Sequence, residues 1–182
     1  MASYLIVHGW QNRRPPEHWQ HWLALQLEAA GHTVSYPQLS DPDAPSLAVW
    51  KREIREHYAA LTGPVIVICH SLACLAWLAL LDDPEPPAPT KLALVAPPSA
   101  GVIKKNRPVA EFAWKPKTML LNAGKSVLIA SDNDPFCPKG ATTEFAEHFD
   151  AEYVVLHDAG HINIQAGFGP WSQMLEWALA DS

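Results

Sequence analysis

Short apolar runs alternate along the chain with longer segments in which apolar residues recur every three or four positions. The short runs are continuously apolar, as in strands that are covered on both faces. They predict strands at residues 4–8, 33–36, 65–69, 91–95, 126–131 and 153–156. The longer segments have the helical period and predict helices around residues 17–30, 46–60, 72–82, 140–149 and 167–180.

This alternation of strands and helices predicts an α/β fold in three layers. A strand followed by a helix and another strand favours parallel pairing through right-handed crossovers, which leaves helices on both faces of one sheet. Ligands of such sheets bind beyond the carboxyl ends of the strands. Side chains that directly follow a predicted strand are therefore the candidates for chemistry.

Length and composition indicate one globular domain over residues 1–182. The chain is 48% hydrophobic and 18% charged, and its proline-rich stretches at 83–89 and 97–98 are too short to separate two domains. The formal net charge is −6. A nucleic-acid-binding protein normally presents a basic face, so this class is excluded.

Neither a membrane protein nor a secreted one is expected. No apolar run reaches the roughly 18 residues of a membrane span, and the N-terminus lacks the basic start of a signal peptide. The three cysteines, Cys69, Cys74 and Cys137, are odd in number, and two lie in apolar runs. Buried free thiols in a reducing compartment explain them, so we expect a cytoplasmic protein.

The most informative segment is the third predicted strand, which ends in Cys69-His70-Ser71-Leu72-Ala73 and leads at once into a helical run. A sharp strand-to-helix turn of this kind raises a serine hydroxyl above the sheet edge. It requires small residues two places before and after the serine. Cysteine and alanine stand there instead of the glycines of the common motif, and the pattern predicts Ser71 as a nucleophile.

Two backbone N–H groups are candidates for an oxyanion hole. The N–H of Leu72 lies at the start of the helix after Ser71, where free N–H groups and the helix dipole favour negative charge. The second donor should come from the turn after the first strand, where Gly9 lets the backbone approach a substrate. We predict the N–H of Trp10, with that of Gln11 as the next choice.

A serine needs a base, and the base needs an acid that orients it. His161 lies in the loop between the last strand and the final helix, whereas His157 is so close to the strand end that it is interpreted as structural. The acid should follow the preceding strand. Asp134 lies there in a turn fixed by proline, while Asp132 can cap the same turn, so Asp134 is preferred.

The predicted site residues follow the third, fifth and sixth strands in the order Ser, Asp, His. This is the order of α/β-hydrolases, and it differs from the orders of the two best-known serine protease folds. The pattern predicts acyl transfer to Ser71 from a small-molecule ester or amide, with no cofactor and no metal.

Four segments of the chain resemble the retinoblastoma-binding-protein-nine family of small serine hydrolases. They are His8-Gly9-Trp10, the serine segment 69–73, the stretch 131–138 and Gly160-His161-Ile162-Asn163. The resemblance covers essentially the whole chain. It implies an α/β-hydrolase fold of about six parallel strands without a large lid, in which Ser71, Asp134 and His161 match the triad of the family. It also implies hydrolysis of esters or peptides.

Other functions fit the sequence less well than this one. A non-catalytic protein-interaction module that keeps the hydrolase fold is the alternative from a different class, because fold alone does not define function. Gly124-Lys125-Ser126 lacks the earlier glycine of a phosphate-binding loop. His18 and His21, with Glu17, have no further metal ligand near them in sequence and are interpreted as solvated. Cys69, at a buried strand end, is predicted to be inert.

The stretch 97–121 separates the fourth and fifth predicted strands. It contains Phe112, Trp114 and Met119 among prolines and lysines. Two interpretations are open: the stretch borders the acyl pocket, or it is a surface connection.

Overall fold

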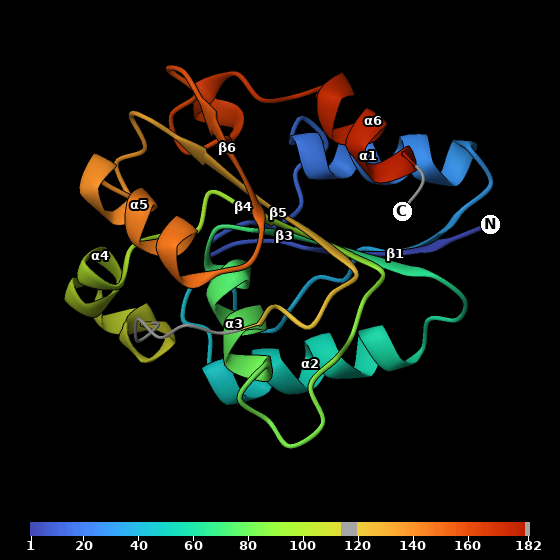
Figure 1. Ribbon diagram of the computed structural model, residues 1–182, viewed down its shortest axis with the longest axis horizontal. Coiled ribbons are helices and arrows are strands. Elements are labelled where there is room, and N and C mark those ends of the chain that lie inside the picture. The colour runs from blue at the N-terminus through green and yellow to red at the C-terminus, as the bar shows by residue number, and fades with distance from the viewer. Residues whose placement is uncertain (114–119, 181–182) are drawn as a thin grey trace.

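The computed structural model describes residues 1–113 and 120–180. Its six strands form one sheet in the order β2-β1-β3-β4-β5-β6, and every pair of neighbouring strands is parallel (Figure 1). The strands are β1 (Ser3–Val7), β2 (Thr33–Ser35), β3 (Val65–His70), β4 (Lys91–Val95), β5 (Lys125–Ser131) and β6 (Glu152–Leu156). The predicted α/β-hydrolase architecture is confirmed.

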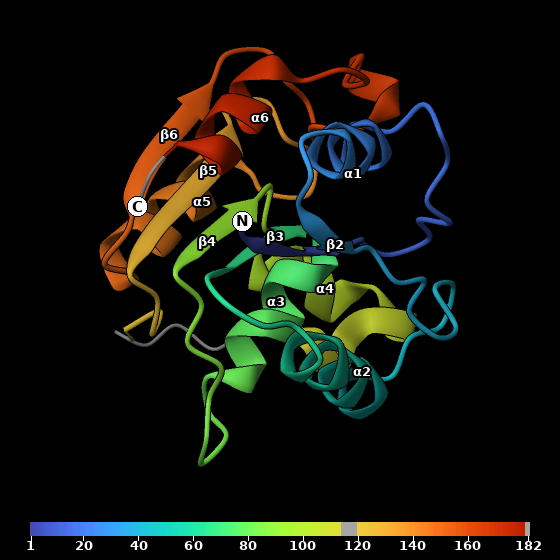
Figure 2. The same cartoon turned by 90° about the vertical axis from the view of Figure 1, so that its right-hand side faces the viewer.

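Helices cover both faces of the sheet, because side chains of the central strands are apolar on both sides (Figure 2). Leu5, Val7 and Val67 point into one apolar cluster, whereas Tyr4 and Ile6 point into the other. Helices α2 (Leu47–Ala59), α3 (Leu72–Leu80), α4 (Ala100–Lys105) and α5 (Lys139–His148) lie on the first face. Helices α1 (Trp19–Ala29) and α6 (Ser172–Leu179) lie on the second.

The connection after β4 is more ordered than a simple loop. It forms α4 and a 3₁₀ helix, η1 (Arg107–Phe112), whose Phe112 ring packs edge-on against that of Trp50. Trp114 and Met119, for which both a place beside the pocket and a surface connection were left open, lie outside the described residues. No helix in the described part of the chain combines the length and the apolar character needed to cross a bilayer.

Candidate active site

Ser71 occupies a one-residue turn between β3 and α3, and its backbone is strained. Its φ of 55° and ψ of −124° lie where L-residues are rarely found. The backbone N–H of Ser71 donates to the carbonyl of Val95 at the end of β4, 2.9 Å away, which holds this conformation. The strand-to-helix turn predicted from the small residues around Ser71 is therefore present.

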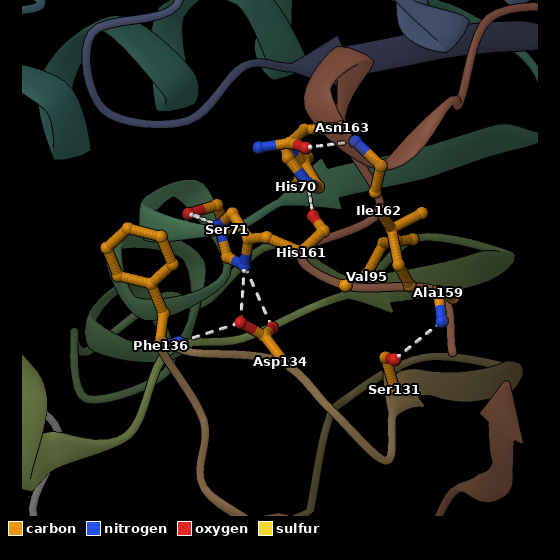
Figure 3. Close-up of polar contacts among 12 residues, drawn as sticks. His70, Ser71, Val95, Ser131, Asp134, Phe136, Ala159, His161, Ile162 and Asn163 are labelled. Atoms are coloured by element: carbon orange, nitrogen blue, oxygen red, sulfur yellow. Dashed lines mark hydrogen bonds and ion pairs between the residues drawn. The ribbon is translucent and has the colours of Figure 1, made fainter. Parts of the chain in front are cut away.

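Three side chains from three separate loops meet beyond the carboxyl ends of β3, β5 and β6 (Figure 3). The Nε2 atom of His161 lies 2.8 Å from the Oγ of Ser71. The Nδ1 atom of His161 lies 2.8 Å and 3.0 Å from the two carboxylate oxygens of Asp134. All three residues are buried to more than nine-tenths of their surface, and Asp134 is the most buried of them.

The imidazole of His161 is also fixed by its neighbours. The Phe136 ring lies against it with a centroid distance of 4.5 Å, and the His70 ring lies 5.2 Å away. The backbone N–H of Phe136 donates to the Oδ1 of Asp134 at 2.8 Å, which fixes the carboxylate. The ring and the carboxylate therefore hold one relative orientation.

Asp132 takes a different place from Asp134. It accepts hydrogen bonds from the Nδ1 of His157 at 2.6 Å and from the backbone N–H of Asp158 at 2.9 Å. It therefore braces the loop that carries His161 without reaching the imidazole. Asn133 braces the same loop, because its Oδ1 accepts from the N–H of Gly160 at 2.7 Å. Nothing in the local sequence around Asn133 indicates this role.

Ligand atoms of Asp132, His157 and Asp158 lie within 4.8 Å of one another, the spacing of a metal site. His157 and Asp158 are exposed, and each of the three residues takes part in a hydrogen bond or ion pair within the group. These contacts hold the His161 loop to the loop after β5. The group is thus accounted for as a brace between two loops.

Gly9 brings the turn after β1 directly against the serine. A Cβ atom on residue 9 would lie 2.8 Å from the Cβ of Ser71, closer than side chains pack. The next two residues, Trp10 and Gln11, differ in whether their backbone N–H groups are hydrogen-bonded. The N–H of Gln11 donates to the carbonyl of Pro42 at 2.8 Å. Among residues 1–113 and 120–180, no acceptor takes the N–H of Trp10 or of Leu72. Between Trp10 and Gln11, it is therefore the N–H of Trp10 that lacks an acceptor in the described part of the chain.

The buried side chain of His8 fixes the peptide that joins Gly9 to Trp10. Its Nδ1 atom lies 2.8 Å from the carbonyl oxygen of Gly9, which can only accept a hydrogen bond, so Nδ1 carries the proton. Its Nε2 accepts the backbone N–H of Leu39 at 2.8 Å. A trans peptide points its N–H away from its carbonyl. The N–H of Trp10 therefore points away from His8.

A cavity of about 790 Å³ opens over this arrangement. Ser71, Leu72, Trp10 and His161 line it, as do Pro98 and Ile103 from the stretch after β4. The stretch after β4 therefore borders the pocket at its first residues. Its later residue Phe112 is buried in the core and is absent from the lining.

Two histidines in the cavity wall were not identified as site residues from the sequence. His70 and His18 both line the cavity, and each is only 3% exposed. The interpretation of His18 as solvated was wrong. Its Nδ1 accepts the backbone N–H of Gln20 and so caps the start of α1, which places the ring inside the protein at the sheet edge.

Because several histidines are buried, we expect the folded protein to lose stability in mild acid. Burial disfavours the charged imidazolium and lowers the pKa of His8 and of His18 to about 4 each; burial also places the pKa of His70 well below its ordinary value. Below pH 6.5 the unfolded chain binds protons that the folded protein excludes, so stability is complete above this pH and falls toward pH 4. His8 and His18 should each contribute a loss of about 3 kcal/mol over this range.

Urea unfolding between pH 7.5 and pH 4.5 measures this loss. The variant His18→Asn keeps a cap for α1 and should flatten the dependence, whereas His21→Asn should leave it unchanged. A free energy of unfolding that stays constant from pH 7 to pH 5 in the unsubstituted protein would contradict the prediction.

Comparison with known proteins gives the family. The family model described as serine hydrolase matches residues 4–178. No curated protein sequence matches this chain.

The solved structures that are similar to this one include the following three. The ydeN gene product of Bacillus subtilis has 22% identity and a TM-score of 0.84, with 98% of this chain and 97% of that chain covered. A YdeN-like protein of Pectobacterium atrosepticum has 26% identity and a TM-score of 0.77, with coverage of 97% and 88%. The esterase domain of a Rhodothermus marinus protein has 14% identity and a TM-score of 0.59, with coverage of 91% and 80%. The family model matches nearly the whole length of this chain. The chain therefore belongs to the serine hydrolase family.

Proposed function

We propose that this protein hydrolyses esters of small carboxylic acids through an acyl-enzyme on Ser71. One observation carries the proposal: the unbroken hydrogen-bond chain from the Oγ of Ser71 through His161 to Asp134. A hydroxyl, an imidazole and a carboxylate in this order form the arrangement that activates a serine. Family membership supports hydrolysis in general, and the chain of contacts supports these residues in particular.

In the first step His161 acts as general base. A carboxylate oxygen accepts a hydrogen bond, so the Nδ1 atom beside Asp134 carries the proton and Nε2 holds a lone pair toward Ser71. The Oγ of Ser71 attacks the carbonyl carbon of the ester while its proton passes to Nε2. Asp134 stabilises the imidazolium that forms, and this is the reason for a buried carboxylate at Nδ1.

The negative charge of the tetrahedral intermediate needs donors that are oriented in advance. The N–H of Leu72 begins α3 and has no acceptor within its own helix. The N–H of Trp10 is held away from His8 by the bond between the His8 imidazole and the Gly9 carbonyl. We assign the oxyanion hole to these two groups, with His8 as the residue that positions the second.

In the second step the imidazolium of His161 returns its proton. The proton passes from Nε2 to the alkoxide oxygen of the leaving alcohol, and the carbon–oxygen bond of the original ester breaks. Water then attacks the acyl-serine with His161 again as base, which releases the acid and restores the Ser71 hydroxyl.

The substrate class follows from the cavity and from the relatives. A volume of about 790 Å³ suits a small molecule. The sequence segments that resemble the retinoblastoma-binding-protein-nine family, and the likeness to an esterase domain, both favour carboxylic esters. A place within that narrower family is part of this proposal.

A fluorophosphonate probe tests the proposal, because it reacts only with a serine that a base activates. We expect one adduct, on the peptide that contains Ser71, found by mass spectrometry. Heat-unfolded protein is the control and should not react. A folded protein that stays unlabelled and hydrolyses no p-nitrophenyl ester from acetate to octanoate would contradict the proposal and favour a non-catalytic interaction module.

A further inference from the structure

The loop that carries His161 has to reach across the sheet to meet the serine. Ser71 follows β3 and His161 follows β6, and the strands β4 and β5 lie between these two in the sheet. Strand pairing brings His161 beside Asp134, because Asp134 follows β5, the neighbour of β6. It does not bring the imidazole to Ser71. A contact between this loop and the end of β3 is needed for that.

Two successive backbone carbonyls of this loop accept hydrogen bonds from distant side chains. The carbonyl oxygen of His161 lies 3.0 Å from the Nε2 of His70, the last residue of β3 (Figure 3). A carbonyl oxygen can only accept, so this Nε2 carries the proton. The next carbonyl, that of Ile162, accepts from the indole N–H of Trp19 on α1 at 2.9 Å. Both donor side chains are almost completely buried.

The backbone of Ile162 is strained between these two carbonyls. Its φ of 49° lies in the left-handed region, which β-branched residues rarely adopt. Such a conformation persists only where the surrounding structure fixes it. The Ile162 side chain is completely buried in the same apolar cluster as Trp19. The two hydrogen bonds hold the peptide groups on either side of its Cα, and with them the backbone direction that His161 needs.

The two donors also pack against each other and against the base. The rings of Trp19 and His70 are nearly perpendicular, with a centroid distance of 5.7 Å, and the His70 ring lies 5.2 Å from that of His161. The backbone of His70 is fixed in the sheet by its pairing with Val95 of β4. Because Ser71 is the next residue, the nucleophile and the base are both placed relative to His70.

We propose that His70 and Trp19 form a clamp on the carbonyls of His161 and Ile162, and that this clamp holds the His161 imidazole at the Oγ of Ser71. The two are positioning residues, because they act through the backbone of the loop. The inference rests on the proposed function of Ser71 and adds the residues that set its efficiency. His161 accepts and returns a proton in both steps, so a displaced imidazole slows acylation and deacylation alike.

Trp19→Phe removes one donor of the clamp and leaves an aromatic ring in the core. On p-nitrophenyl butanoate we expect kcat and kcat/KM to fall together by about 10- to 100-fold, because a small misplacement of the base has a cost of this size. KM should stay nearly unchanged. Trp19 is absent from the cavity lining, so a lost contact with substrate would not explain the fall.

Trp77→Phe is the matched control for this variant. The indole of Trp77 is also completely buried, and its Nε1 has no hydrogen-bond partner within residues 1–113 and 120–180. The substitution therefore removes the same atoms from the core without removing a hydrogen bond to the His161 loop. It should keep the kcat of the unsubstituted protein.

Two variants with side chains of similar length test His70. The amide nitrogen in His70→Gln can take the place of Nε2 and donate to the His161 carbonyl, whereas His70→Met has no donor. We expect His70→Gln to keep most of kcat and His70→Met to lose about as much as Trp19→Phe. Both remove the imidazole from the cavity wall, so the difference between them measures the hydrogen bond. This pair also tests the clamp if Trp19→Phe does not fold.

A second background separates positioning from a general loss of packing. In Asp134→Asn the imidazole has already lost the carboxylate that orients it, so its exact place matters less. Trp19→Phe should then lower kcat by less than about 3-fold in that background. An effect on packing alone would give the same fall in both backgrounds.

The outcomes differ from those of a failed hydrolase assignment. If the fluorophosphonate labels Ser71 and folded Trp19→Phe and His70→Met both keep kcat, the clamp is wrong and the hydrolase stands. Equal kcat values for His70→Gln and His70→Met, or an equal effect of Trp19→Phe in both backgrounds, also overturn the clamp. If the unsubstituted protein is not labelled and hydrolyses no p-nitrophenyl ester, both proposals fail.

Discussion

Ser71→Ala should lower ester turnover by about 10⁴- to 10⁶-fold while the protein remains folded. The hydroxyl is the only group of the relay that forms the bond to substrate, so its loss removes the acyl-enzyme. Alanine fits the same space and meets the same backbone strain at φ 55°, and the fold should survive. Residual hydrolysis above the rate in water should come from the remaining polarising groups.

The measurement is kcat on a p-nitrophenyl ester, with a thermal unfolding curve for each variant. Ser172→Ala, at the exposed start of α6, is the matched control and should keep full turnover. Near-normal hydrolysis by folded Ser71→Ala would reject the serine as nucleophile, and with it the acyl-enzyme.

Asp134→Asn should lower turnover by about 10⁴-fold, and Asp132→Asn by less than about 10-fold. An asparagine at 134 can donate toward the Nδ1 of His161. It then favours the tautomer whose proton is on Nε2, where a lone pair is needed. Asp132 contacts the loop that carries His161, through His157 and the N–H of Asp158. Asp132→Asn should therefore loosen that loop, while Asp134 still holds the imidazole of His161.

These two variants control for each other, because both remove one carboxylate from the same turn after β5. Turnover is compared at several pH values, with stability measured alongside. If Asp132→Asn proves the more damaging of the two, the orienting acid is Asp132, and the contact between Asp134 and His161 is structural.

The fold and the meeting of Ser71, Asp134 and His161 were predictable because their signals are local. Continuous apolar runs such as Val65-Ile66-Val67-Ile68 indicate strands covered on both faces, and parallel order then places the following residues at one edge. The pairing of Asp134 and His161, 27 positions apart, follows from β5 and β6 being neighbours. Topology alone brings them together.

The histidines of the cavity wall were not predictable in the same way. His18 and His21, at the start of α1, are spaced like residues of a solvated face, and nothing local shows that His18 caps the helix inside the protein. The role of His8 depends on Leu39, which lies 31 positions away. The final helix also begins at Ser172, later than predicted from residue 167, because Asn163 first caps a 3₁₀ turn, η2 (Ile164–Ala166). Such contacts depend on how loops pack.

The strained backbone at Ser71 sets a thermodynamic cost for any serine at this position. A residue with φ of 55° and ψ of −124° is about 1–3 kcal/mol less stable there than in a relaxed conformation, and glycine would avoid most of that penalty. In a lineage released from selection for hydrolysis, drift toward glycine at this position would make the molecule more heat-resistant. A serine at this position therefore carries a stability cost that a glycine would mostly avoid.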